Sequence, residues 1–103
     1  MISEKIRKLI PTIQKFMEDQ PIRRAWLFGS CSRGEETPES DVDILVDYDD
    51  SNGMVSLFKM GGIVMDLSDL LGCRVDLVEN RGLKNFARKS VERDKILIYE
   101  RPD

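Results

Sequence analysis

The sequence predicts one small α/β domain in which helices pack on a short mixed β-sheet. Amphipathic helical patterns alternate along the chain with short apolar runs of strand length. The 103 residues suffice for one hydrophobic core and are too few for a catalytic domain joined to a large substrate domain. No repeat, linker or low-complexity tract divides the chain, so we expect a single domain over residues 1–103.

The first element is an amphipathic helix. Apolar residues recur at three- and four-residue spacing over residues 6–17, and Ser3 is a suitable N-cap. Pro11 lies inside this pattern and is expected to kink or restart the helix, because its ring removes a backbone hydrogen bond.

Two strands are predicted next, with a polar segment between them. Residues 22–28 form an apolar run that starts after Pro21 and ends at Gly29. Residues 31–40 are polar and are expected to begin as a short helical turn before they loop back. Residues 41–46 read as the second strand.

The second half of the chain predicts a helix, a strand, a helix and an extended end. The first helix covers residues 54–71, although Gly61 and Gly62 weaken its middle, and Gly72 is a good C-cap. The later elements are expected at residues 74–78 (strand), 83–93 (helix) and 96–99 (extended).

The composition is that of a soluble globular protein, with 41% hydrophobic and 34% charged residues. No apolar run is long enough to cross a bilayer, and the N-terminal residues show no secretory pattern, so we expect a cytoplasmic protein without a membrane partner. A net charge of −3 argues against a protein that binds nucleic acid by neutralising many phosphates.

Any metal in this protein is expected to be bound by oxygen atoms. The chain has no histidine, and its two cysteines, Cys31 and Cys73, are too few and too far apart for a zinc site. The lack of histidine also removes the commonest general base, so proton transfer falls to carboxylates or to a metal.

Asp41 and Asp43 form a candidate metal-binding pair. Side chains two apart in a strand point to the same face, and a rise of about 3.3 Å per residue puts the two Cα atoms roughly 6.6 Å apart. Mg²⁺ takes such carboxylates together with water and phosphate oxygens. The alternative is a pair of solvated carboxylates at a strand edge, since this motif is common.

Asp76 is the candidate third carboxylate. It lies within an otherwise apolar strand, where an unpaired carboxylate is costly to bury. If this strand lies beside the second one, the three carboxylates could hold two Mg²⁺ ions about 3.5–4 Å apart and stabilise the attacking and leaving oxygens of a phosphoryl transfer. The alternative is that Asp76 faces solvent or pairs with Arg74.

Gly29 and Ser30 are candidate phosphate-binding residues, because a strand that ends in Gly-Ser before a helical turn offers backbone N–H groups and a hydroxyl. Arg33 adds a bidentate phosphate partner. A P-loop is excluded, since Glu35 and Glu36 stand where Lys and Ser or Thr are required.

Taken together, these motifs resemble the signature of the DNA polymerase β-like nucleotidyltransferase superfamily, and within it the minimal nucleotidyltransferase (MNT) family. The resemblance covers nearly the whole chain. The matching residues are Gly29-Ser30, Arg33-Gly34, Ser40-Asp41-Val42-Asp43 and, on the next strand, Asp76.

The resemblance implies a palm-like mixed sheet and a catalytic set held on it. Asp41, Asp43 and Asp76 are implied to bind Mg²⁺, with Asp76 also a candidate for deprotonating the attacking hydroxyl. The nucleotide, ATP as AMP donor, is implied to bind to Gly29, Ser30, Arg33 and Ser40.

The resemblance also implies a biological setting. MNT domains often act as antitoxins beside a HEPN-domain ribonuclease toxin from a neighbouring gene, and some silence it by adding AMP to a tyrosine. We therefore expect a hetero-oligomer and a nucleotidyltransferase that modifies a protein hydroxyl. The alternative is an antitoxin that neutralises its toxin by contact alone.

The remaining apolar residues are expected to pack. Trp26 and Phe28 are assigned to the core, and Cys31 to a filler role. The methionines at positions 54, 60 and 65 are interpreted as core or interface filler.

Overall fold

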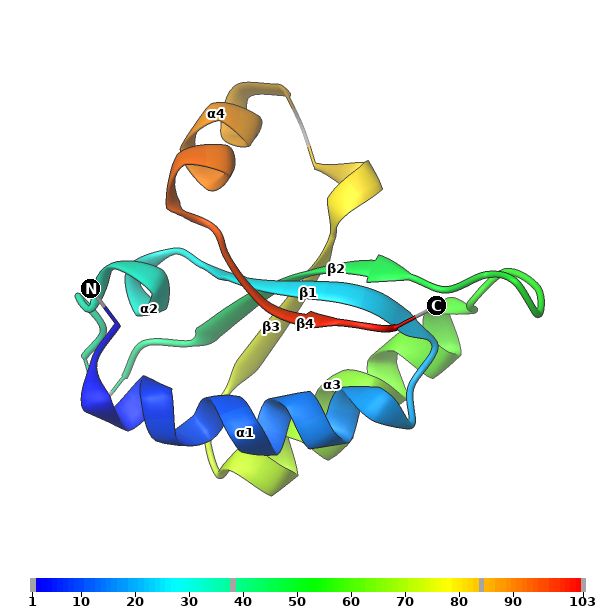
Figure 1. The fold of residues 1–103 in the computed structure, drawn as a ribbon, viewed down its shortest axis with the longest axis horizontal. Coiled ribbons are helices and arrows are strands. Elements are labelled where there is room, and N and C mark those ends of the chain that lie inside the picture. Colours follow the sequence, from blue (N-terminus) through cyan, green and yellow to red (C-terminus); the bar gives the residue numbers. More distant parts are fainter. Residues whose placement is uncertain (1, 38, 84, 103) are drawn as a thin grey trace.

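A computed structural model describes residues 2–37, 39–83 and 85–102. Figure 1 shows helices on both sides of a central sheet. The elements in chain order are α1 (Glu4–Glu18), β1 (Ile22–Phe28), α2 (Ser30–Arg33), β2 (Val42–Tyr48), α3 (Leu57–Leu71), β3 (Val75–Glu79), a 3₁₀ turn (Asn80–Gly82), α4 (Asn85–Asp94) and β4 (Ile96–Glu100).

The sheet is mixed, as the sequence predicts. Its strand order is β3-β2-β1-β4. Strand β1 is antiparallel to both β2 and β4, and β2 is parallel to β3. The parallel pair needs a crossover between its strands, and α3 supplies it.

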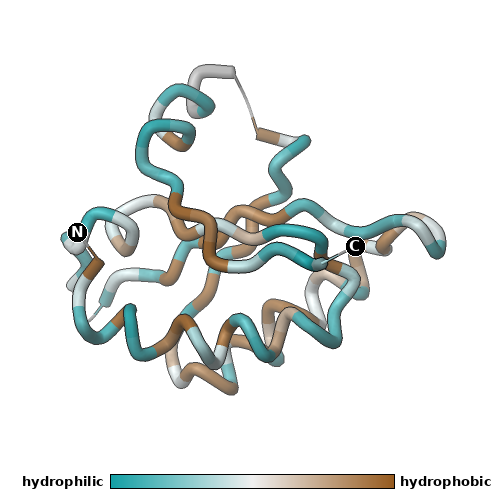
Figure 2. The backbone as a smooth tube through the Cα atoms, in the orientation of Figure 1, coloured by the Kyte–Doolittle hydropathy of each residue, from teal (hydrophilic) through white to brown (hydrophobic). Residues whose placement is uncertain are grey.

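Helices α1 and α3 cover one face of the sheet, while α4 stands over the other (Figure 1). The main core lies under α1 and α3, where fully buried side chains of the helices meet those of the strands. In Figure 2 the hydrophobic segments run through the strands at the centre, whereas α4 is mostly hydrophilic. This core includes Ile6, Ile13, Met17, Ala25, Leu27, Ile44, Val46, Ile63 and Leu67.

The predicted helix caps are confirmed. The Ser3 hydroxyl accepts a hydrogen bond from the Ile6 N–H at 3.2 Å, and Gly72 ends α3 in the left-handed conformation. The prediction that Pro11 restarts the first helix is wrong, because α1 runs through it as one helix with Pro11 exposed to solvent.

Two predicted helix boundaries move. Helix α3 begins at Leu57 rather than at residue 54, since the Ser56 hydroxyl accepts the Lys59 N–H at 3.0 Å and caps the helix there. Helix α4 begins at Asn85, because residues 80–82 first form a 3₁₀ turn. The predicted helical residue 84 lies outside the described part of the chain.

Trp26 and Phe28 do not enter the main core, contrary to expectation. Both are only half-buried, and they alternate with the buried Ala25 and Leu27, which places them on the face of the sheet that α4 overlies. Lys95 stands 4.8 Å over the Trp26 ring. No helix in the described ranges has the length and apolar character needed to span a bilayer.

Candidate active site

The end of β1, the start of β2 and the start of β3 meet at one end of the sheet. Phe28, the last residue of β1, pairs with Asp43 of β2, and Asp43 pairs in turn with Asp76 of β3. Two residues paired across neighbouring strands point to the same face of a sheet. The fold therefore brings the predicted Asp43 and Asp76 together from positions 33 residues apart in the sequence.

Gly29 lies directly against this carboxylate pair. Its φ of 72° is one that side chains rarely allow, and a Cβ added there would stand 2.5 Å from Oδ2 of Asp43. Both the backbone conformation and the close approach therefore require glycine. Gly29 of the Gly-Ser motif and Asp43 of the Asp-x-Asp motif, predicted separately from the sequence, therefore lie side by side.

The electrostatics of this site are those of uncompensated negative charge. The pKa of Asp43 is raised from 3.8 to about 6, first by burial and then by repulsion from Asp76 and Asp41. Within the described ranges, no Lys or Arg forms an ion pair with Asp43 or Asp76, whereas the largely solvated Arg74 lies 3.6 Å from Asp41. The alternative that Asp76 pairs with Arg74 is therefore wrong, because Arg74 lies beside Asp41 instead.

The burial of the carboxylates differs from expectation. The apolar strand around Asp76 predicts a buried carboxylate, yet the Asp76 side chain is exposed, in agreement with the alternative that it faces solvent, while Asp43 is half-buried. The strand that carries Asp76 is at the edge of the sheet, which leaves that side chain open to solvent. An exposed carboxylate next to a half-buried one can meet a second substrate from outside.

The donors fit a hard divalent cation, because they are carboxylate oxygens whose mutual repulsion a cation would relieve. In the described part of the chain, however, no group of three Cys, Asp or Glu side chains is placed so that it could hold a metal ion as it stands. The assignment of Asp41, Asp43 and Asp76 as metal ligands stays a prediction.

Helix α2 packs the phosphate-binding candidates against the sheet. The Ser32 hydroxyl donates to the Gly29 carbonyl at 2.8 Å and is buried, so it has a structural role. The Ser30 hydroxyl has no hydrogen-bond partner among the described residues and is free for a ligand. Cys31 fills the core as expected. Its thiol donates to the Asp41 carbonyl at 3.3 Å, and burial raises its pKa.

Arg33 and Ser40 are already engaged within the chain. The Arg33 guanidinium donates to Oε1 of Glu35 at 2.8 Å and to Oδ2 of Asp94 at 2.9 Å, which ties α2 to the end of α4. The Ser40 hydroxyl accepts the Thr37 N–H at 2.9 Å and closes the loop before β2. Sequence reasoning missed Asp94, because no local pattern links it to a residue 61 positions away.

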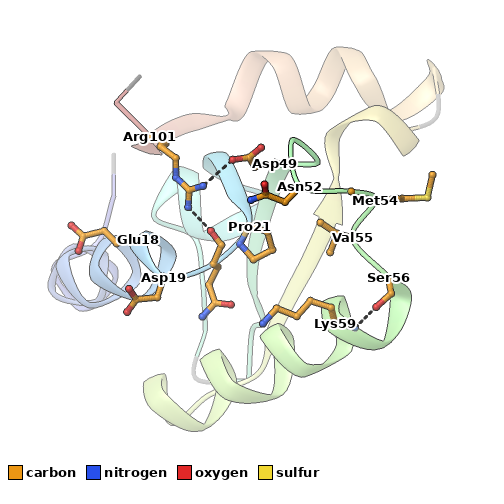
Figure 3. Close-up of a pocket in the computed structure, with 12 residues that line it drawn as sticks. Glu18, Asp19, Pro21, Asp49, Asn52, Met54, Val55, Ser56, Lys59 and Arg101 are labelled. Carbon is orange, nitrogen blue, oxygen red and sulfur yellow. Dashed lines mark hydrogen bonds and ion pairs between the residues drawn. The ribbon is translucent and has the colours of Figure 1, made fainter.

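A large hollow lies at the opposite end of β1 and β2 from these residues (Figure 3). It has a volume of about 590 Å³ and includes none of the motif residues. Within it, the Arg101 guanidinium donates to Oδ2 of Asp49 at 3.0 Å and to the Gln20 carbonyl. These contacts fasten the C-terminal segment to the turns that flank β1 and β2, and we assign this end of the sheet a structural role.

Comparisons with known proteins agree with the family resemblance. The family model described as "Polymerase beta, Nucleotidyltransferase" matches residues 11–103. Protein adenylyltransferase MntA of Thermococcus cleftensis is 36% identical over 96 residues, which are 92% of this chain and 94% of that protein.

Solved structures share the fold. A structure assigned provisionally as a minimal nucleotidyltransferase matches with a TM-score of 0.76 and 32% identity over 93% of this chain and 95% of its own. A chain of a toxin-antitoxin structure with AMP-PNP has a TM-score of 0.76 at 24% identity, over 89% of this chain and 73% of its own. A chain from a Shewanella oneidensis complex of a tri-AMPylated HEPN toxin with an MNT antitoxin has a TM-score of 0.69 at 22% identity. The match covers 92% of this chain and 72% of that chain.

Proposed function

The chain belongs to the polymerase beta nucleotidyltransferase family, and we propose that it transfers AMP from ATP to a hydroxyl group of a partner protein. A relative that matches over nearly its whole length is named as a protein adenylyltransferase, which supports this activity over polymerisation. The observation that carries the proposal is the junction of Gly29, Asp43 and Asp76 at one end of the sheet.

We propose that the partner is a HEPN-type toxin encoded by a neighbouring gene, and that this chain is its antitoxin in a hetero-oligomer in the cytoplasm. The structures of a toxin-antitoxin with AMP-PNP and of an AMPylated HEPN toxin with an MNT antitoxin support this partner through their shared fold.

In this proposal the triphosphate lies against Gly29 and Ser30. The missing side chain at Gly29 lets a phosphate approach the backbone beside Asp43, and the free Ser30 hydroxyl donates to a phosphate oxygen. Arg33 stands on the same short helix, and it binds a phosphate in this proposal by exchanging its contact with the exposed Glu35 while it keeps the contact with Asp94.

Asp41, Asp43 and Asp76 would hold Mg²⁺, which when bound polarises the α-phosphate and offsets the charge of the triphosphate and the carboxylates. The acceptor oxygen forms a bond to the α-phosphorus, and the bond to the bridging oxygen of pyrophosphate breaks. The acceptor hydroxyl loses its proton to Asp76, whose side chain is open to a partner.

Intact-mass spectrometry of the neighbouring gene product tests this function. After incubation with this chain, ATP and Mg²⁺, the toxin should gain one or more AMP units. The double variant Asp41→Asn/Asp43→Asn should bind the toxin without modifying it, and Asp47→Asn, on the same strand but outside the site, should act as the wild type. An unmodified toxin in a stable, neutralised complex would reject transfer and establish the contact-only antitoxin instead.

A further inference from the structure

The outer face of α3 exposes large apolar side chains that nothing in the described chain covers. Leu57, Phe58 and Met65 are 84%, 93% and 68% exposed, and Met54, in the segment just before the helix, is 91% exposed. Phe58 and Met65 are seven residues apart, so they lie on one side of the helix two turns from each other. The opposite side of α3 carries the buried Ile63 and Leu67, and this outer face therefore points away from the core. Apolar patches of this kind mark protein interfaces.

A pair of glycines lies at the centre of this face. Each of Gly61 and Gly62 costs a helix about 1 kcal/mol relative to alanine. Their φ angles are negative, and an added Cβ would meet nothing within 4 Å at either position, so no contact with the described residues requires glycine there. Glycines at such a position allow the backbone of a second helix to approach closely.

The charged residues of α3 are distributed unfavourably with respect to the dipole of the helix. The first turn contains no acidic residue and carries Lys59, while the last turn contains no basic residue and carries Asp69. Asp66 adds a further negative charge to the C-terminal half, and neither of these aspartates forms an ion pair with another described residue. If a second α3 packed antiparallel on this face, its acidic C-terminal half would lie beside the N-terminus of the first, which is the positive end of the helix dipole. The negative charges would be stabilised there.

We infer that this face of α3 pairs antiparallel with the same face of a second copy of the chain. Phe58 and Met65 are equally distant from the midpoint between Gly61 and Gly62. A two-fold axis at that midpoint therefore sets Phe58 of each copy against Met65 of the other, with the glycines at the crossing. The same axis sets the acidic C-terminal half of each α3 beside the N-terminal turn of the other. Both the apolar pattern and the charge pattern of α3 are thus complementary to themselves, which selects a second copy over an unrelated protein.

Sedimentation equilibrium of the purified chain, from about 1 μM to about 1 mM, tests the pairing without ATP or toxin. The average mass should rise toward twice the 11.9 kDa of one chain as the concentration increases. Phe58→Asp should weaken the dimer by at least about 30-fold, since it buries a charge against Met65 of the other copy. A chain that stays monomeric over this range would overturn the inference, even if the same face bound another protein.

Two further variants separate a loss of pairing from a loss of folding. Gly61→Leu should raise the melting temperature of the monomer, because leucine favours a helix, and yet abolish the dimer, because it fills the crossing. Leu70→Asp, a matched change at an exposed leucine on another side of α3, should dimerise as the wild type does. A Gly61→Leu dimer of unchanged affinity would place the contact elsewhere and overturn the inference.

Discussion

Gly29 and Asp43 are in such close contact that a single methyl group at Gly29 would stand 2.5 Å from the carboxylate oxygen Oδ2 of Asp43. The contact joins the loop after β1 to the second strand. It makes the conformation of the Gly-Ser motif and the position of the half-buried Asp43 carboxylate depend on each other.

Gly29→Ala should destabilise the protein and remove nucleotide transfer. Alanine at position 29 must adopt an unfavourable φ of 72°, and its methyl group displaces Asp43. These two effects together should lower the free energy of unfolding by about 2–4 kcal/mol. Gly72→Ala is the control for a positive φ alone, because Gly72 has a φ of 69° and a ψ of 23°, in the left-handed helical region, and its Cβ would meet nothing within 4 Å. Gly29 has a ψ of −155°, which side chains tolerate less well, so its larger cost includes this backbone strain as well as the Asp43 contact. Gly72→Ala should cost only about 1 kcal/mol and leave transfer intact. Urea unfolding measures both, and equal costs would contradict the role of the Asp43 contact.

Asp43→Asn should stabilise the metal-free protein at neutral pH and abolish transfer. The pKa of about 6 in the folded state exceeds the ordinary 3.8, so the folded state binds more protons than the unfolded state between about pH 4 and pH 6. Stability is therefore lost as the pH rises through this window. The variant should recover about 1 kcal/mol at pH 7.5, a value reduced for partial exposure, and nothing at pH 4. Urea unfolding in EDTA at both pH values measures this, and Asp47→Asn is the control.

Ser30→Ala should weaken nucleotide binding, whereas Ser32→Ala should lower the stability of the protein. The free Ser30 hydroxyl is proposed to bind phosphate, so its loss should weaken binding of a non-hydrolysable ATP analogue several-fold and leave the melting temperature unchanged. The buried Ser32 hydroxyl is bonded to the Gly29 carbonyl, so its loss should cost about 0.5–1.5 kcal/mol of stability. Calorimetric titration and thermal unfolding measure the two effects. Normal nucleotide binding by Ser30→Ala would remove Ser30 from the site.

Arg101→Met should lower the melting temperature by several degrees and leave transfer unchanged. Arg101 bonds to Asp49 and to the Gln20 carbonyl, at the end of the sheet away from Gly29. Removing the guanidinium leaves both acceptors without this donor. Arg7→Met, an exposed arginine on α1, should change neither property. A loss of transfer in Arg101→Met with stability retained would show that the hollow in Figure 3 takes part in the reaction.

The sequence by itself determined those features that depend on neighbouring residues. The run 22–28 was identified as a strand with its observed bounds, because apolar β-forming residues between Pro21 and Gly29 define it locally. Ser3 and Gly72 were identified as helix caps for the same reason. The resemblance carried by the motifs also indicated the family that the comparisons show. The pairing of Asp41 with Asp43 stays a prediction, because β2 begins at Val42 and Asp41 lies just before it.

Only the tertiary structure decided which distant residues meet. The opposition of Asp43 and Asp76 depends on the register of two parallel strands joined through α3, and the bond from Arg33 to Asp94 depends on where α4 ends. No periodicity of the sequence encodes either distance. Tertiary packing also decided which apolar residues are covered. Helix α3 has apolar residues on more than one side, and the sheet can bury only one of them, which leaves Phe58 and Met65 in solvent.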